Sequence, residues 1–199
     1  MSTEGVNEGR RRFLIGATSA VGAVGVVGAA VPFVKSWNPS AKAKTAGAPV
    51  VADISKLEVG QRMTVEWRGK PVWILRRSKE AMASLDAVED NLRDPDSSEA
   101  KQPDYVAGDA RARDGHEEIV VLIGLCTHLG CSPLYRPEVA PADLGADWMG
   151  GFFCPCHGSK FDFSGRVFKS VPAPLNLEVP PYYYMSDTLI KIGEDGEAA

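Results

Sequence analysis

The cysteines and histidines of this 199-residue chain gather in two short segments. The first reads Cys-Thr-His-Leu-Gly-Cys at 126–131, and the second reads Cys-Pro-Cys-His-Gly-Ser at 154–159. Each segment holds one Cys–His pair and one further cysteine: Cys126, His128 and Cys131 in the first, and Cys154, His157 and Cys156 in the second. Thiolates and imidazoles are ligands for transition metals. The two segments therefore predict one metal centre held by two loops.

The donor set fits an iron–sulfur cluster with mixed ligands. Thiolates on one iron hold negative charge, whereas neutral imidazoles on the other iron leave the cluster less negative. A less negative cluster accepts an electron more easily, so its reduction potential lies well above that of an all-cysteine cluster. The two extra cysteines suit a disulfide that holds the loops together.

Other uses of these residues are open at this point. Structural zinc sites with two Cys and two His usually start from cysteines separated by two to four residues. Here a single residue separates Cys126 from His128, which favours iron–sulfur over zinc. All six side chains could also be ligands, or Cys131 and Cys156 could be free thiols. An oxidising compartment, indicated below, argues against both arrangements.

The paired motifs resemble those of the Rieske iron–sulfur proteins, and within them the iron–sulfur subunit of the bacterial cytochrome bc complex. The resemblance implies one [2Fe-2S] cluster whose two irons have different ligands: Cys126 and Cys154 on one iron, His128 and His157 on the other. It also implies a disulfide between Cys131 and Cys156. Ring-hydroxylating Rieske oxygenases carry the four ligands without the extra cysteines, so this chain resembles them less.

The resemblance also implies roles for residues beside the ligands. His157 would accept a hydrogen bond and a proton from quinol. The turn 171–174, Val-Pro-Ala-Pro, resembles the proline loop that covers the cluster, so Pro172 and Leu129 would form a docking face. Ordinary packing beside Gly130 explains Leu129 equally well.

Two further residues are expected to tune the reduction potential. In the family a serine hydroxyl bonds a bridging sulfide, and Ser159 stands at that position. Two residues later the family usually has a tyrosine that bonds a cysteine sulfur, whereas this chain has Phe161. The missing hydroxyl predicts a lower potential than that of the tyrosine-containing relatives.

The composition is that of a globular protein, with 44% hydrophobic and 24% charged residues. From residue 50 onward the chain has 16 basic and 24 acidic residues, a net charge of −8. Such a surface could steer a basic partner such as a cationic cytochrome c. A merely solvated acidic surface is at least as good an explanation, and nucleic acid is not an expected partner.

The N-terminal segment resembles a twin-arginine export signal, because Arg10 and Arg11 are followed by a spacer and then Phe13-Leu14. The alternative is a cytoplasmic charge anchor. The 22 residues 13–34 carry no charge, and as a helix of about 33 Å they would cross a hydrocarbon core of about 30 Å. A removable signal peptide is the other possibility, since 41–43 and 46–48 read Ala-x-Ala. We favour a retained anchor.

These segments predict four parts: a cytoplasmic tail at 1–12, a transmembrane helix at 13–34, a flexible tether at 35–49 and a periplasmic head at 50–199. The cluster-binding part would span about 126–174. The twin-arginine route carries folded proteins, so the cluster could be inserted before export and the disulfide formed in the periplasm. The resemblance implies that the tether lets the head move between a quinol site and a cytochrome.

Many short strands with turn residues between them predict a mainly β, antiparallel Rieske-type head with a small cluster-binding subdomain. Ser78 is expected to cap a short helix that reaches Val88, and 133–149 to be an insertion between the cluster loops. His116, in a charged segment, is expected at the surface. The expected strands and hairpins are 62–67 with 71–75, 118–125, 151–153, 161–168, and 182–185 with 188–192.

The sequence thus predicts the electron-transfer subunit of a quinol–cytochrome c oxidoreductase in the bacterial inner membrane. Its expected partners are cytochrome b and c-type cytochrome subunits in a dimeric complex, together with quinol. The alternative is the Rieske subunit of another periplasmic oxidoreductase, such as one handling arsenite.

Overall fold

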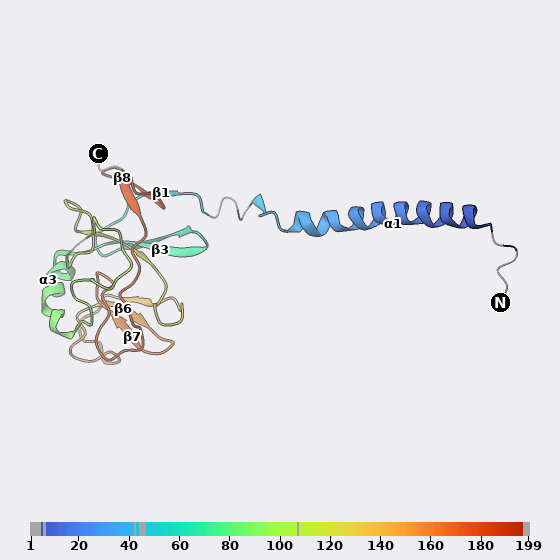
Figure 1. Ribbon diagram of the computed structural model, residues 1–199. Coiled ribbons are helices and arrows are strands. Elements are labelled where there is room, and N and C mark those ends of the chain that lie inside the picture. The colour runs from blue at the N-terminus through green and yellow to red at the C-terminus, as the bar shows by residue number, and fades with distance from the viewer. Residues whose placement is uncertain (1–4, 6, 42, 44–46, 107, 197–199) are drawn as a thin grey trace. The chain divides into compact units, whose positions relative to one another are not determined.

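The computed structural model describes residue 5 and residues 7–41, 43, 47–106 and 108–196. The chain divides into two compact units, residues 1–45 and 46–199, and each is described here by itself (Figure 1). The tail expected at 1–12 and the tether expected at 35–49 include residues 1–4, 6, 42 and 44–46, which lie outside the described residues.

The N-terminal unit contains helix α1, Glu8–Ser36. It starts at Glu8, earlier than the apolar run, because the Asn7 side chain caps it by accepting a hydrogen bond from the Arg10 amide at 3.0 Å. Its 29 residues are long and apolar enough to cross a membrane, and α1 alone among the described helices meets that test. None of its side chains is buried within the chain.

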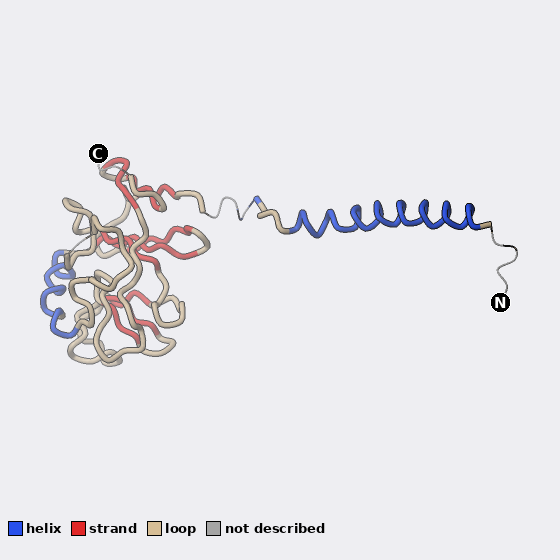
Figure 2. Tube along the Cα trace, viewed as in Figure 1, coloured by secondary structure: helices blue, strands red, loops and turns tan. Residues whose placement is uncertain are grey.

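The head is built from three antiparallel three-stranded sheets, drawn as red segments joined by long tan loops in Figure 2. The terminal sheet has the order β1-β9-β8, the central sheet β2-β3-β4, and the third sheet β5-β6-β7. The bounds are β1 Val50–Asp53, β2 Arg62–Trp67, β3 Lys70–Arg76, β4 Ile119–Ile123, β5 Leu134–Arg136, β6 Gly151–Cys154, β7 Ser159–Phe161, β8 Tyr182–Ser186 and β9 Leu189–Ile192. The mainly β prediction is confirmed.

The central sheet holds the core. Strands β2 and β3 form the expected hairpin, with Arg68 (φ 53°) and Gly69 (φ 71°) in the left-handed conformation that a two-residue turn requires. All five residues of β4 are buried, and the strand leads directly to the first cysteine segment. The expected helix is α3, Lys79–Ala87, capped by Ser78, and the short 3-10 helix η1, Glu89–Asn91, follows it.

The third sheet carries the second cysteine segment and rests on the central sheet. The Trp73 ring of β3 stacks on Phe152 of β6, with the ring centroids 5.0 Å apart. A Cβ on Gly124 would lie 2.3 Å from the Trp73 ring, so only glycine fits where the chain leaves β4. These contacts fix the two cysteine segments on a shared apolar base.

The structure departs from the expected elements in two places. The segment 133–149 is more than an insertion, because β5 pairs with β6 and Trp148 is buried in a second apolar cluster with Leu92 and Phe168. The hairpin expected at 161–168 reduces to a single bridge between Phe161 and Val167. The strand instead begins at Ser159 and pairs with β6, which makes the second cysteine segment a hairpin.

Candidate metal centre

The two cysteine segments form loops of matching geometry. The Gly130 amide donates to the Cys126 carbonyl, and the Gly158 amide donates to the Cys154 carbonyl, each at 2.9 Å. Both glycines follow their cysteine by four residues and have nearly equal positive φ angles of 79° and 78°. A side chain would strain that backbone although nothing lies within 4 Å of either Cβ position. The sequence does contain a signal for Gly130 and Gly158, the repeated Cys-x3-Gly spacing, but the predictions from sequence did not include these glycines.

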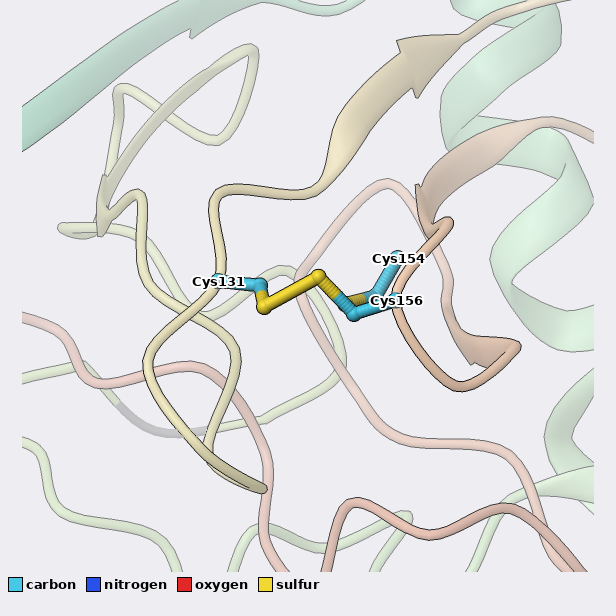
Figure 3. Close-up of side chains that lie close together, drawn as sticks. All are labelled: Cys131, Cys154 and Cys156. Atoms are coloured by element: carbon cyan, nitrogen blue, oxygen red, sulfur yellow. A yellow bond between two sulfur atoms is a disulfide. The ribbon is translucent and has the colours of Figure 1, made fainter.

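A disulfide joins the two loops. Cys131 and Cys156 are bonded, with their Cα atoms 6.7 Å apart, and Figure 3 shows Cys154 beside this bond. The expected pairing is confirmed. The sulfurs of Cys131, Cys154 and Cys156 lie within 4.8 Å of one another, but the disulfide removes two of them from metal binding. Cys126 and Cys154 are left as the free thiols of the chain.

The free thiols lie on the inner side of the loops. Cys126 is 3% exposed and Cys154 is 1% exposed. Burial raises the pKa of the Cys126 thiol, the neighbouring Cys154 raises it further, and the Ser159 hydroxyl lowers it. Cys126 of the first loop therefore lies next to Cys154 and Ser159 of the second loop.

The imidazoles lie on the outer side. The ring centroids of His128 and His157 are 4.7 Å apart and the rings are nearly perpendicular, at 88°. His157 is exposed and His128 is half-buried. Two buried thiols and two outward imidazoles, supplied equally by two loops, fit a two-iron cluster in which each iron has its own ligand type.

The third histidine lies away from this centre. His116 stacks on the Tyr184 ring, with centroids 3.8 Å apart, and is half-buried, so its expected surface position is only partly right. Burial raises the pKa of Tyr184 strongly. The contact is therefore part of the packing beside β8.

The proline-containing turn 171–174 is hydrogen-bonded to both loops. The Ala173 amide donates to the Ser159 hydroxyl at 3.0 Å, and the Thr127 hydroxyl donates to the Leu175 carbonyl at 2.6 Å. Nothing in the motif marked Thr127, because the acceptor lies 48 residues away in the chain. Pro172 and Leu129 are exposed, Leu129 by 71%, whereas Ala173 is fully buried.

Phe161 and Ser159 flank the thiols on β7. Both side chains are fully buried. Phe161 pairs with Phe152 in the sheet, while Ser159 pairs with Cys154. Both residues therefore lie beside the second loop, and their expected tuning role stays a prediction.

This fold and this pair of loops define a Rieske-type protein, and residues 99–181 match the family model described as the Rieske [2Fe-2S] domain. Residues 1–40 match the model described as "Ubiquitinol-cytochrome C reductase Fe-S subunit TAT signal". The chain is 58% identical over 199 residues to the ubiquinol-cytochrome c reductase iron-sulfur subunit of Allochromatium vinosum, covering 100% of this chain and 95% of that protein. It belongs to the family of the iron–sulfur subunits of ubiquinol-cytochrome c reductase.

One further relative and one solved structure are also similar to this chain. The subunit of the same name from Bradyrhizobium diazoefficiens is 46% identical over 184 residues, covering 92% of this chain and 94% of that protein. A chain of a structure described as a hyperthermophilic respiratory complex III is 28% identical with a TM-score of 0.47, covering 87% of this chain and 96% of that one.

The family settles several expectations. The chain is an electron-transfer subunit of an oxidoreductase complex with cytochrome partners, and it carries one Rieske [2Fe-2S] cluster. The zinc and arsenite-oxidoreductase alternatives are therefore set aside. The apolar helix and the export-signal model fit a single-pass membrane anchor with an exported head.

Proposed function

We propose that this chain takes one electron from a quinol at the outer face of the bacterial inner membrane and passes it to a c-type cytochrome of the same complex. The main support is the placement of His157, which is exposed while its ring contacts His128 above the buried thiols. A ligand at the surface can touch a substrate and the metal centre at once. The relatives named above carry ubiquinol and cytochrome c in their names.

The two sides of the site support the proposed set of four ligands. Cys126 and Cys154, buried and in contact, would hold one iron as thiolates. His128 and His157, on the outer side, would hold the other iron as neutral imidazoles. Metal binding would replace the proton that burial otherwise keeps on the Cys126 thiol.

When bound there, the cluster supplies a one-electron acceptor of high potential. His157 would accept a hydrogen bond from the quinol hydroxyl at the ring nitrogen that faces away from the metal. The same nitrogen would take up the proton, because a metal of lower charge withdraws less electron density and leaves the imidazole more basic. His157 thus couples the proton to the electron.

The rim around His157 would dock on the quinol site. Leu129 and Pro172 are exposed apolar side chains, one on the first loop and one on the proline-containing turn. Burying them against a partner would exclude water from the reacting hydroxyl. The acidic head would then meet a basic c-type cytochrome after the electron is taken up.

The assembly would be a dimeric complex with cytochrome b and a c-type cytochrome, anchored by α1. The export-signal match at 1–40 supports a periplasmic head, with the apolar helix kept as a single-pass anchor in the inner membrane. Protease added to spheroplasts should then remove the head and leave α1 with the membranes.

The proposal is tested by electron paramagnetic resonance of ascorbate-reduced membranes, with and without a quinol-site inhibitor. Ascorbate is a mild reductant, so only a high-potential cluster gives a signal. We expect a Rieske-type signal that changes shape when the inhibitor binds. A signal that ignores the inhibitor would remove the quinol site from the proposal and leave only the cluster.

Replacing Phe161 with tyrosine should raise the midpoint potential. Phe161 is fully buried beside the second loop, and a hydroxyl there could donate to a cysteine sulfur, which favours the reduced and more negative cluster. One such hydrogen bond is worth about 0.5–1.5 kcal/mol, or roughly 20–65 mV for one electron at about 59 mV per tenfold. A redox titration monitored by the cluster signal measures the shift.

The matched control is Phe163→Tyr. Phe163 is also buried, but it lies two residues further on and lines a cavity of about 490 Å³. We expect no change in its midpoint potential. An equal rise in both variants, or no rise in Phe161→Tyr, would contradict the tuning role of position 161.

A further inference from the structure

The proline-containing turn is not held by strand pairing, although Ala173 is buried in the core and Val171 packs against it. Residues 169–181 contain no strand in the structure, and the turn contacts the cysteine loops through the Ala173 amide and the Leu175 carbonyl. Its outer flank is open, because Ser170 and Val171 line a cavity of about 480 Å³ together with Gly158 and Trp148. Contacts elsewhere must therefore help to keep the turn against the cysteine loops.

Asn176, which follows this turn, is hydrogen-bonded at both polar atoms of its side chain. Its side chain is 1% exposed. The Oδ1 atom accepts from the Val167 amide at 2.8 Å. The Nδ2 atom donates to the Asp94 carbonyl at 2.9 Å and to the Ser97 hydroxyl at 3.0 Å. This one side-chain amide therefore links the segment after the turn to Val167 and to the segment 94–97.

These bonds close the turn at its base. Val167 precedes the turn and Asn176 follows it, so the bond between them makes residues 167–176 a closed loop. The next residue repeats the closure, with the Leu177 amide donating to the Gly165 carbonyl at 2.8 Å. The bonds to Asp94 and Ser97 anchor that base to the segment after η1.

The anchoring segment is itself preorganised. Asp94 accepts hydrogen bonds from the Ser98 and Glu99 amides at 2.8 Å and 3.1 Å, and it is buried. Ser97 holds a left-handed backbone with φ 55°, which is unfavourable for serine unless its surroundings enforce it. The Asp94 carbonyl and the Ser97 hydroxyl are therefore held in place, and together they hold the Asn176 side chain in one orientation.

We infer that Asn176 is a positioning residue for electron transfer: it holds the turn 171–174 and the adjoining Leu175 against the two cysteine loops and thereby orients the Ser159 hydroxyl toward the cluster. The Ala173 amide occupies the Ser159 oxygen, which leaves the hydroxyl hydrogen free for the sulfur side. Opening of the turn would release that hydrogen bond and admit water. This inference rests on the proposed ligand set.

The test is Asn176→Asp in the full chain within its complex. Aspartate keeps an acceptor for the Val167 amide, but it loses the bonds donated to the Asp94 carbonyl and the Ser97 hydroxyl. It also loses the longer bond of 3.4 Å to the Asp94 Oδ2 and places a second carboxylate beside that atom. Hydrogen exchange at the Ala173 amide should become about fivefold to a hundredfold faster, since each lost hydrogen bond weakens closure by a factor of about two to ten. The midpoint potential should fall, and a chelator should remove iron faster.

The matched control is Ile190→Ala in the terminal sheet, where Ile190 is fully buried in β9. It should weaken global folding without changing the exchange at Ala173 or the potential. If Asn176→Asp does not accumulate, Ser97→Ala removes only one of the donated bonds and should give smaller shifts in the same direction.

The inference would be overturned if Asn176→Asp lowered the unfolding temperature, as the control does, but left the Ala173 exchange rate and the midpoint potential unchanged. Asn176 would then have a purely structural role. The proposed ligand set is tested by a different measurement, the iron content of variants in which a ligand is replaced. Hydrogen exchange at Ala173 does not depend on which side chains bind iron, so the two ideas can be contradicted independently.

Discussion

Replacing either free cysteine with serine should abolish the cluster. In Cys126→Ser and in Cys154→Ser we expect iron per chain to fall to about a tenth of the normal value or less, and the Rieske signal and quinol oxidation to disappear. The reason is that a thiolate is the metal ligand, whereas a serine hydroxyl stays protonated at neutral pH. Both side chains are buried, so water cannot easily take the vacated ligand position. Elemental analysis and electron paramagnetic resonance measure the loss.

The disulfide cysteines provide the control. The double variant Cys131→Ser/Cys156→Ser loses a link between residues 25 positions apart, which is worth about 3–4 kcal/mol in the chain-entropy account. At low temperature, where the weakened head remains folded, it should keep its iron. Loss of iron from a folded double variant, or two irons retained in Cys126→Ser, would contradict the ligand assignment.

Replacing Asp162 with asparagine should destabilise the head by about 3–5 kcal/mol, the cost of breaking a buried ion pair. Asp162 and Arg166 are both buried, and the carboxylate accepts from the Arg166 Nε at 2.7 Å and from the Arg166 amide at 2.7 Å. Such a loss is a large share of the roughly 5–15 kcal/mol that stabilises a domain. It should lower the unfolding temperature by about 10 °C or more, measured by circular dichroism on the purified complex.

The size of this effect comes from the charges that surround Asp162. Two other buried guanidinium groups, those of Arg77 and Arg111, lie close enough for Asp162 to favour their charged forms. Burial lowers the pKa of each to about 10, and Asp162 opposes that shift. Both remain charged at neutral pH. Removing the carboxylate would leave Arg166 with only the half-exposed Asp109 as an ionic partner and would take from Arg77 and Arg111 a buried anion that favours their charged forms.

An exposed pair of similar geometry is the control. Arg136 donates to both carboxylate oxygens of Asp143, at 2.8 Å and 3.0 Å, but the Asp143 side chain is 59% exposed. Water screens that pair, so Asp143→Asn should leave the unfolding temperature nearly unchanged. If the two variants lowered it equally, burial could not be the reason for the Asp162 effect.

Much of the fold was predictable from local patterns. The hairpin of β2 and β3 follows from alternating residues around Arg68-Gly69, the cap of α3 from Ser78, and β4 from an unbroken apolar run. These signals are local, since turn chemistry, capping and side-chain period act within a few residues. Strand β5 was not predicted, because its three residues depend on β6 for their hydrogen bonds.

The sequence by itself determined the chemistry of the centre. The ligand types and their spacing predicted a mixed Cys–His iron–sulfur site, and the family resemblance assigned Cys126, His128, Cys154 and His157 as its ligands, which stays a prediction. The pairing of Cys131 with Cys156 also came with the resemblance and is confirmed. The apolar run within α1 was also predictable from the sequence. Crossing a membrane requires length and apolar composition, and both are properties of a continuous segment.

Only the tertiary structure decided what surrounds the centre. Thr127 reaches Leu175, Arg111 reaches Ser164 and Leu177, and Asn176 reaches Asp94, across 48 to 82 residues of chain. Each is a polar side chain with no motif of its own, since a buried donor must find an acceptor but the sequence does not say which one. The partners are set by how the sheets pack, and packing is a property of the whole chain.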